Sequence, residues 1–345
     1  MSSGASHPET IGRYRILRKL GAGAMGEVYL ARDPNIDRLL AIKTVRTVID
    51  GAADAVQEHT NRLLREARAA GRLMHPSVVA LFDTDQADGV LYLAFEYVEG
   101  GDLAQRIVMP PPLTLRQVLT LVQQVASGLG YAHAQGIVHR DIKPTNLLIR
   151  GKDGAAKIAD FGIAKLSQST QLTRTGTVVG SPQYMSPEQI RGAPLDGRSD
   201  LFSLGVITYE LLTGRRPFDG DTLSTLVFQI LSQEPPAIAD LRGDAPPSVV
   251  HLVERLLAKD RDARIADAAT LEREVRQLLS DLPAMALEAP ASGRFEGTVP
   301  IPAAAPSPAE PPTVPMQPTA TAPLAPTAAA ASALGTAATD PDAPT

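Results

Sequence analysis

The sequence predicts an α+β protein with a small β-rich N-terminal part containing one helix, a larger helical part, and a disordered C-terminal tail. Three observations carry this prediction. Short β-like runs fill about the first hundred residues, the hydrophobic periodicity then becomes helical, and 13 of the 29 prolines lie between Pro290 and Pro344. With 345 residues, the chain is long enough for two ordinary domains or one large two-part domain.

The composition excludes several classes of protein. The net charge is −5 and charged residues make up 21%, so the basic excess of a dedicated nucleic-acid-binding protein is missing. The lack of cysteine excludes a disulfide framework, a thiolate metal site and a cysteine nucleophile. No apolar run reaches the ~18–20 residues that a membrane span needs, and the N-terminus lacks a signal-peptide core. We therefore expect a cytoplasmic protein with no nucleic-acid partner and no membrane span.

The N-terminal elements are predicted from turn signals and β-like runs. A flexible polar arm covers residues 1–12, and the lobe that follows covers residues 13–98. A glycine-rich turn joins the first two predicted strands, and Asp33-Pro34-Asn35 marks the turn before the third. The predicted strands are residues 14–17, 27–31, 39–45, 78–82 and 90–97, with a helix from about 53 to 73.

The larger lobe, residues 99–281, is predicted from helical spacing of apolar residues. Its predicted helices cover residues 115–135, 201–213, 223–231, 249–258 and 268–279, and the second of these is apolar enough to be buried all round. Residues 282–345 are rich in Pro, Ala and Thr and contain a single aromatic residue, Phe295. Such a segment buries too little apolar surface to offset the entropy of ordering it, so we expect a disordered tail or linker.

A glycine-rich motif, Gly21-Ala22-Gly23-Ala24-Met25-Gly26, is the first sign of a ligand site. The same spacing also occurs in dinucleotide-binding turns, where the glycines open a helix. Here the β-like run Glu27-Val28-Tyr29-Leu30 follows, which favours a hairpin whose backbone N–H groups cover ATP phosphates. A hairpin tip without a ligand is the alternative.

Lys43 ends the apolar triplet Ala41-Ile42-Lys43 on the next predicted strand. An ammonium group on a strand packed on both faces needs a partner. The functional interpretation pairs Lys43 with the α- and β-phosphates and with a helical carboxylate, for which Glu66 is the candidate and Glu58 the weaker competitor. A solvated helix face is the alternative interpretation of Glu66.

The strongest signal is the run His139-Arg140-Asp141-Ile142-Lys143-Pro144-Thr145-Asn146, followed further on by Asp160-Phe161-Gly162. Asp141 is predicted to accept or orient the proton of a substrate hydroxyl, and Lys143 to neutralise charge on a transferred phosphoryl group. Asn146 and Asp160 supply the hard oxygen ligands that Mg²⁺ prefers. Ordinary turn residues are the alternative, which the joint presence of the glycine-rich loop and Lys43 disfavours.

These motifs occur in the order typical of one family. Across residues 13–281 the chain resembles bacterial eukaryotic-like (Hanks-type) serine/threonine protein kinases, with Ser186-Pro187-Glu188 in place of the usual Ala-Pro-Glu. The resemblance implies the bilobal protein-kinase fold and transfer of the ATP γ-phosphoryl group to Ser or Thr hydroxyls of protein substrates in bacterial signalling. Mg²⁺ is the implied metal, with Mn²⁺ as an alternative. The rival from another class is an ATP-binding pseudokinase scaffold.

The resemblance also implies roles for single residues. The backbone of Glu96 and Val98 is expected to bind adenine, with Phe95 as gatekeeper and Asp102 facing the ribose. Glu188 is expected to pair with Arg264, and Asp200 to hold the backbone around His139 and Arg140. The remaining implied ATP contacts are Leu20, Gly21, Ala22, Gly23, Ala24, Met25, Gly26, Val28 and Ala41, beside Lys43, Asn146 and Asp160.

Regulation is predicted from a run of Ser and Thr residues after Asp160. Autophosphorylation of Thr173 and Thr175 would add negative charge that pairs with Arg140 and Lys165; a solvated polar loop is the alternative. Ser181 stands where Thr is commoner, and its hydroxyl is expected to reach Asp141 and Lys143. Ser186 is expected to change little. Homodimerisation through the N-lobe occurs in similar kinases and is an analogy here.

Overall fold

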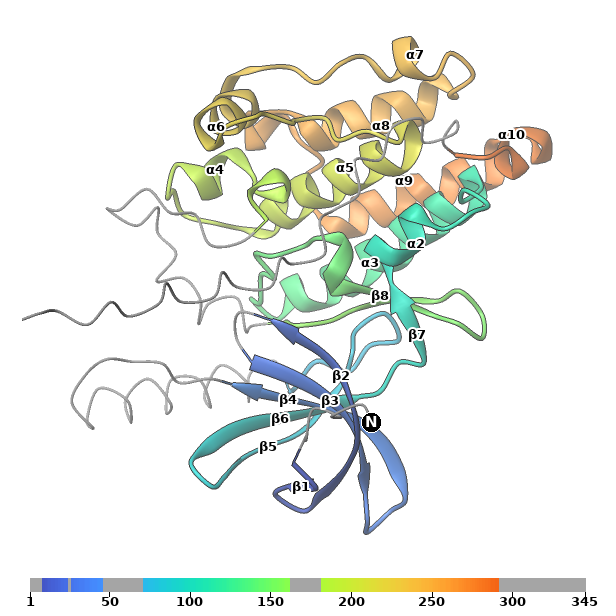
Figure 1. Ribbon diagram of the computed structural model, residues 1–345. Coiled ribbons are helices and arrows are strands. Elements are labelled where there is room, and N and C mark those ends of the chain that lie inside the picture. The colour runs from blue at the N-terminus through green and yellow to red at the C-terminus, as the bar shows by residue number, and fades with distance from the viewer. Residues whose placement is uncertain (1–7, 24–25, 46–70, 162–180, 292–345) are drawn as a thin grey trace, which may run out of the picture. The chain divides into compact units, whose positions relative to one another are not determined.

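The N-terminal strands form one antiparallel six-stranded sheet in the order β1-β2-β3-β4-β6-β5 (Figure 1). This computed structural model describes residues 8–23, 26–45, 71–161 and 181–291. The strands are β1 (Thr10–Ile11), β2 (Tyr14–Gly23), β3 (Gly26–Asp33), β4 (Arg38–Val45), β5 (Leu81–Ala87) and β6 (Val90–Glu96). The predicted strands 14–17, 27–31, 39–45 and 90–97 are therefore confirmed, the first of them longer than predicted.

One face of this sheet carries the small N-lobe core. Tyr14 and Ile16 are buried while Arg15 and Leu17, which alternate with them, are exposed, which is the two-residue period of a half-buried strand. Ile11 from β1 belongs to the same buried cluster. The fold therefore begins before residue 13, inside the segment that the sequence had suggested was a flexible arm.

The prediction of a strand over residues 78–82 is wrong. The strand β5 starts only at Leu81, and Val78 makes a single isolated bridge with Ile158. Val78 is buried in the core of the helical lobe rather than in the N-lobe sheet, which explains why this apolar run does not extend the strand. The predicted helix over residues 53–73 lies outside the described residues up to position 70, and residues 71–72 form a turn.

The C-lobe is built around the helix α5 (Gly197–Thr213), which packs against α3 (Leu115–Ala134), α8 (Pro247–Leu257) and α9 (Ala268–Asp281) (Figure 1). Every α5 residue from Ser199 to Leu212 is buried, as predicted for a helix that is apolar on all sides. Asp196 caps its N-terminus and Gly214, in the left-handed conformation, ends it.

The other helices of this lobe are short. They are α2 (Leu103–Val108), α4 (Pro187–Ile190), α6 (Leu223–Ser232), α7 (Ile238–Leu241) and α10 (Ala284–Glu288), with 3-10 turns η1 (Pro144–Asn146), η3 (Pro182–Tyr184) and η4 (Arg261–Ala263). The five helices expected from periodicity, which correspond to α3, α5, α6, α8 and α9, are confirmed with small shifts at their ends. Within the described ranges, no helix combines the length and apolar character needed to cross a bilayer.

A second antiparallel sheet, in the order β7-β8-β9, was not anticipated. Its strands β7 (Gly100–Asp102), β8 (Leu147–Arg150) and β9 (Ala156–Ile158) have only three or four residues each, too few to show a period. The sheet positions the candidate site, because Asn146 directly precedes β8 and Asp160 lies two residues after β9.

The C-terminal end of the described fold lies beyond the predicted boundary at residue 281. Ala291 donates its N–H to the carbonyl of Leu113, and Leu115 donates to the carbonyl of Ala289. Leu287 on α10 is 2% exposed. Residues 284–291 therefore close the N-terminal end of α3 instead of belonging to the tail.

Replacing Gly205 on α5 by Ala is expected to destabilise the protein. An added Cβ would lie 2.7 Å from the Cβ of Leu256 on α8, so the two helices would have to separate. We expect a loss of about 1–3 kcal/mol, measured by chemical denaturation. Gly130→Ala on α3 is the matched control, because its Cβ would make only ordinary contacts at 3.6 Å or more and alanine favours helix. Equal stability of the two variants would contradict this packing argument.

Candidate active site

The glycine-rich sequence lies in the β2–β3 hairpin, where Gly21 pairs with Val28 and Gly23 with Gly26. The glycines do not open a helix, so the dinucleotide-binding alternative is wrong. A Cβ at Gly21 or Gly23 would meet no atom of the described residues within 4 Å, which leaves room for a ligand to approach the backbone. Gly26 has φ +147°, and a Cβ there would collide with the Thr44 carbonyl of β4. Ala24 and Met25 lie outside the described residues.

Other residues expected to contact ATP lie on this sheet. Ala41 and Lys43 are on β4, where Lys43 pairs with Val28 across to β3. Leu20 is exposed on β2, and Ala22 pairs with Glu27 near the end of the hairpin.

Lys43 forms an ion pair with Asp160, with 2.7 Å between Nζ and Oδ2. The ammonium-bearing side chain is 13% exposed, so it has the partner that its burial requires. The expected partner, Glu66, and its competitor Glu58 lie outside the described residues. Among the residues that the structure describes, it is Asp160 that balances the charge of Lys43.

The loop from His139 to Asn146 gathers three polar side chains. The Lys143 ammonium lies 2.8 Å from Oδ2 of Asp141. The amide Nδ2 of Asn146 donates both to the Asp141 carbonyl, at 2.8 Å, and to its carboxylate Oδ2, at 3.1 Å. The Asp141 side chain remains 41% exposed. This arrangement holds an accessible carboxylate beside a cation, which is suitable for orienting a hydroxyl group next to an anionic reactant.

Two oxygen atoms of the site are available to a metal ion. Asn146 uses its amide nitrogen for Asp141, and Asp160 uses Oδ2 for Lys43, so Oδ1 of each makes no hydrogen bond to another described residue. Across the described ranges, no group of three or more His, Asp or Glu side chains gathers that could hold a metal by itself. Two hard oxygen ligands fit Mg²⁺, which typically completes its shell with water and phosphate oxygens.

Two residues of the site have backbone conformations that side chains disfavour. Arg140 has φ +69° and Asp160 has φ +64°. At Arg140 the carboxylate of Asp200 compensates, because it accepts the N–H of His139 at 2.8 Å and that of Arg140 at 2.7 Å. The expected role of Asp200 is therefore confirmed. A third contact was missed, since His133 on α3 also lies 2.8 Å from Asp200 Oδ2.

His139 joins the two ends of the site through its buried ring. The Nδ1 atom faces the N–H of Asp141, at 3.2 Å, and must accept a hydrogen bond. The Nε2 atom lies 2.8 Å from the carbonyl of Ala159 and must donate one. These partners assign the neutral tautomer with hydrogen on Nε2. Phe161 packs edge-on against the ring, with 4.7 Å between the ring centroids.

The segment expected to bind adenine begins at Glu96, the last residue of β6. The N–H of Glu96 donates to the carbonyl of Ala80, at 2.8 Å. This donor is therefore occupied, so a base bound here would have to use the Glu96 carbonyl and the N–H of Val98. The Glu96 carboxylate accepts from Lys157, at 2.9 Å. Phe95 is half-buried at the end of β6.

Asp102, expected to face the ribose, is the N-cap of α2. Its Oδ1 accepts the N–H of Gln105 at 2.8 Å. This contact gives Asp102 a structural role that the resemblance did not suggest, and only the other carboxylate oxygen is left for a ligand.

Ser186, which stands in place of the usual alanine, caps the helix α4. The expectation that this serine changes little is therefore wrong. The buried hydroxyl of Ser186 accepts the N–H of Gln189, and the Gln189 side chain accepts the N–H of Ser186 at 2.9 Å. This reciprocal arrangement is a capping box at the start of α4. The Ser-x-x-Gln pattern in the sequence was the signal that identifies it.

The predicted ion pair between Glu188 and Arg264 is confirmed. Arg264 donates to both carboxylate oxygens, at 2.7 and 2.8 Å, and its side chain is fully buried. Ser199 donates to the same carboxylate at 2.7 Å, a contact that the sequence did not predict. The segment from Ser181 to Arg191 is therefore anchored to the C-lobe.

The charge of Glu188 makes the stability of the fold dependent on pH. Burial raises the pKa of Glu188, but hydrogen bonds from Arg264 and Ser199 outweigh burial and hold the pKa at about 2, against an ordinary 4.5. The unfolded state therefore binds more protons between these values, so the stabilisation is complete above pH 4.5 and is lost as the pH falls towards 2. We expect the melting temperature of Glu188→Gln, followed by circular dichroism, to fall less steeply with acidification than that of the wild type. Parallel slopes would contradict this.

Some predicted regulatory contacts are not formed or lie outside the described residues. The Ser181 hydroxyl makes no hydrogen bond with Asp141 or Lys143 in the described part of the chain, where these two pair with each other. Lys165, Thr173 and Thr175 lie in the 162–180 range that the structure does not describe.

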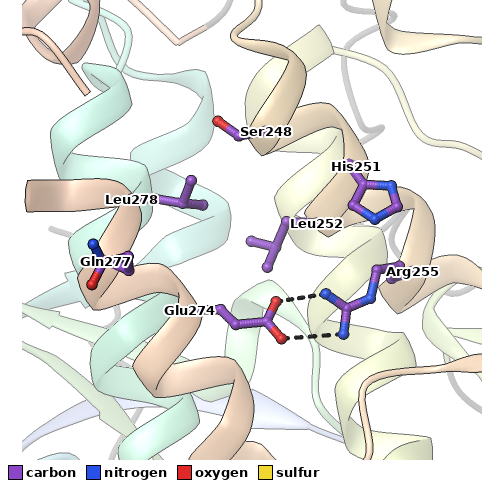
Figure 2. A pocket seen from close by; sticks show the side chains of 7 residues that line it. All are labelled: Ser248, His251, Leu252, Arg255, Glu274, Gln277 and Leu278. Carbon is purple, nitrogen blue, oxygen red and sulfur yellow. Dashed lines mark hydrogen bonds and ion pairs between the residues drawn. The ribbon is translucent and has the colours of Figure 1, made fainter. Parts of the chain in front are cut away.

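A pocket elsewhere in the C-lobe lies between α8 and α9 (Figure 2). Leu252 and Leu278 line it, and Arg255 closes one side through two hydrogen bonds to Glu274, at 2.7 and 3.1 Å. Its lining includes none of the residues of the candidate site, so we assign it to helix packing.

Comparison with known proteins places this geometry in a family. The model of the protein kinase domain matches residues 14–276. The chain is 41% identical over 265 residues to the serine/threonine-protein kinase PrkC of Bacillus subtilis, covering 77% of this chain and 40% of that protein. It is 40% identical over 274 residues to the serine/threonine-protein kinase pkn3 of Myxococcus xanthus, covering 76% and 49%. The chain thus spans less than half the length of these relatives.

A solved structure of a kinase domain supports the same family assignment. The crystal structure of the Mycobacterium tuberculosis PknI kinase domain superposes with a TM-score of 0.61 at 29% identity, covering 80% of this chain and 99% of that chain. The domain match, the relatives and the shared fold lead to one conclusion. The chain belongs to the protein kinase family, within its bacterial eukaryotic-like (Hanks-type) serine/threonine group.

Proposed function

We propose that this protein transfers the γ-phosphoryl group of ATP to Ser or Thr hydroxyls of protein substrates. One observation carries the proposal: Asp141, Lys143 and Asn146 form one hydrogen-bonded group, while Asp160 is paired with Lys43 from the glycine-rich sheet. The activity of relatives named serine/threonine-protein kinases supports the acceptor class.

Asp141 is the proposed base. Its carboxylate accepts or orients the hydroxyl proton of the acceptor, so that the oxygen attacks phosphorus in line with the leaving group. Lys143 lies beside the same carboxylate and offsets the negative charge on the transferred group. Asn146 keeps Asp141 in this orientation through two hydrogen bonds.

Lys43 and the glycine-rich hairpin bind the phosphates in this proposal. The ammonium of Lys43 approaches the α- and β-phosphates while Asp160 keeps it in place. The backbone at Gly21 and Gly23 is unobstructed and supplies N–H donors. The carbonyl of Glu96 and the N–H of Val98 bind adenine.

Asn146 and Asp160 would hold Mg²⁺, or Mn²⁺ in its place, through the two oxygen atoms described above. When bound, the metal supplies positive charge that neutralises the phosphate oxygens. The residues of the chain do the remaining work of orientation.

Autophosphorylation at Thr173 and Thr175, with Arg140 and Lys165 as partners, stays a prediction. So do homodimerisation through the N-lobe and a cytoplasmic location. Phosphopeptide mapping of protein made in bacteria tests the first: phosphate absent from residues 167–177 of an active protein would remove that prediction.

The proposed function is tested by intact-mass measurement after incubation with ATP and Mg²⁺, with casein as a generic acceptor. We expect the wild type to phosphorylate itself or the acceptor and Lys43→Met to add no phosphate. Lys152→Met, at an exposed lysine, is the matched control and should behave as wild type. Wild-type transfer by Lys43→Met would overturn the proposed roles.

A further inference from the structure

Gln189 on α4 connects the segment after Ser181 to the loop from His139 to Asn146, which carries Asp141. Its Nε2 donates to the carbonyl oxygen of Arg140 at 2.7 Å. Its Oε1 accepts the N–H of Ser186 at 2.9 Å. Since one end of the amide faces a carbonyl and the other an N–H group, its orientation is fixed by both partners.

We propose that Gln189 is a positioning residue for catalysis, which sets the orientation of Asp141 through the backbone of Arg140. The proposal rests on the proposed kinase function. Nothing in the sequence resemblance assigned a role to this side chain.

The peptide unit between Arg140 and Asp141 is the point of action. Its carbonyl oxygen accepts from Gln189, and its N–H, which belongs to Asp141, donates to Nδ1 of His139 at 3.2 Å. Rotation of this peptide plane would change the direction in which the Asp141 side chain leaves the backbone. The two hydrogen bonds oppose that rotation from opposite sides.

Arg140 needs contacts that hold its backbone, because its conformation is one that side chains disfavour. A side-chain-bearing residue at φ +69° persists only when its surroundings hold it there. Asp200 holds the N–H side of Arg140, at 2.7 Å, and Gln189 holds its carbonyl side.

Gln189 is itself held firmly. Its neighbour Glu188 is bound to Arg264 in the buried ion pair, and Ser186 closes the capping box. Through its hydrogen bond to Arg140, the Gln189 amide therefore fixes the loop that bears Asp141 relative to the anchored helix α4. Capping of α4 needs only the Oε1 atom, so the Nε2 donor is the part of the side chain that serves positioning.

Two substitutions separate these roles. Gln189→Glu keeps a capping oxygen, and Glu suits this position of a capping box, but it removes the donor to Arg140. Ser186→Ala keeps the donor and removes the capping hydroxyl. Gln117→Glu is the matched control, because Gln117 closes an equivalent capping box with Thr114 at the start of α3.

The measurements are kcat, the KM for ATP and the melting temperature of the full chain, with casein as acceptor. We expect Gln189→Glu to lower kcat roughly tenfold or more, a measurable loss of transition-state stabilisation, with the KM for ATP and the melting temperature close to wild type. Gln189→Met, which carries no charge, should show the same loss of kcat. Ser186→Ala should melt earlier and retain kcat, and Gln117→Glu should match wild type.

Wild-type kcat in Gln189→Glu would overturn the proposal and leave Gln189 as a helix cap only. If Gln189→Glu does not fold, the kcat of Gln189→Met decides in its place, and if neither folds the role is structural and the proposal fails. An inactive wild-type protein would instead contradict the proposed function, and the comparison with Lys43→Met identifies that case.

Discussion

Asp141→Asn is expected to reduce the rate of phosphoryl transfer by about 10²- to 10⁴-fold, the usual contribution of a positioned general base. Asparagine has the same shape as aspartate, so the contacts from Lys143 and Asn146 to an oxygen atom at this position are retained. What is lost is the negative charge and the ability to accept the hydroxyl proton. The effect is therefore expected in kcat, with little change in the KM for ATP.

Single-turnover measurement of phosphate transfer to casein tests this expectation. Asp240→Asn is the matched control, because Asp240 is an exposed carboxylate on α7 and its loss should leave the rate unchanged. Transfer by Asp141→Asn within about twofold of wild type would show that another group handles the proton, since a positioned base contributes far more than this.

Arg264→Met is expected to destabilise the protein by about 3–5 kcal/mol, the usual effect of removing one partner from a buried ion pair. The guanidinium group donates to Glu188 and to the carbonyls of Ala258 and Lys259, and it lies over the ring of Phe202. Methionine fills much of the volume but leaves the Glu188 carboxylate buried, with Ser199 as its one remaining side-chain donor among the described residues.

Thermal unfolding followed by circular dichroism measures this loss, which corresponds to roughly 2–4 °C for each kcal/mol in a domain of this size. The double variant Glu188→Met/Arg264→Met is the control. It removes both charges, so we expect it to be more stable than Arg264→Met alone. A single variant that melts with the wild type, or a double variant no better than the single one, would contradict the expectation.

The sequence was informative wherever the chemistry lies on a short contiguous stretch. The run from His139 to Asn146 and the Asp160 triplet were recognisable because one loop and one turn carry them. The long helices α3 and α5 were equally clear, because burial over four or five turns imposes a period on the sequence.

Tertiary contacts were harder to predict. The pairing of Lys43 with Asp160 joins positions that are 117 residues apart, and no local pattern records it. Val78 has the apolar character of a strand residue, yet the core of the C-lobe buries it. Asp102 and Ser186 each cap a helix whose four to six residues are too few to recognise in advance.

The imidazole of His139 acts as a molecular spacer. Its two ring nitrogen atoms form hydrogen bonds to the backbone, Nδ1 to the N–H of Asp141 and Nε2 to the carbonyl of Ala159. Ala159 is the residue immediately before Asp160. One rigid ring therefore joins the backbones of the two loops that carry the proposed base, Asp141, and the proposed metal ligand, Asp160, and it restrains the distance between these loops.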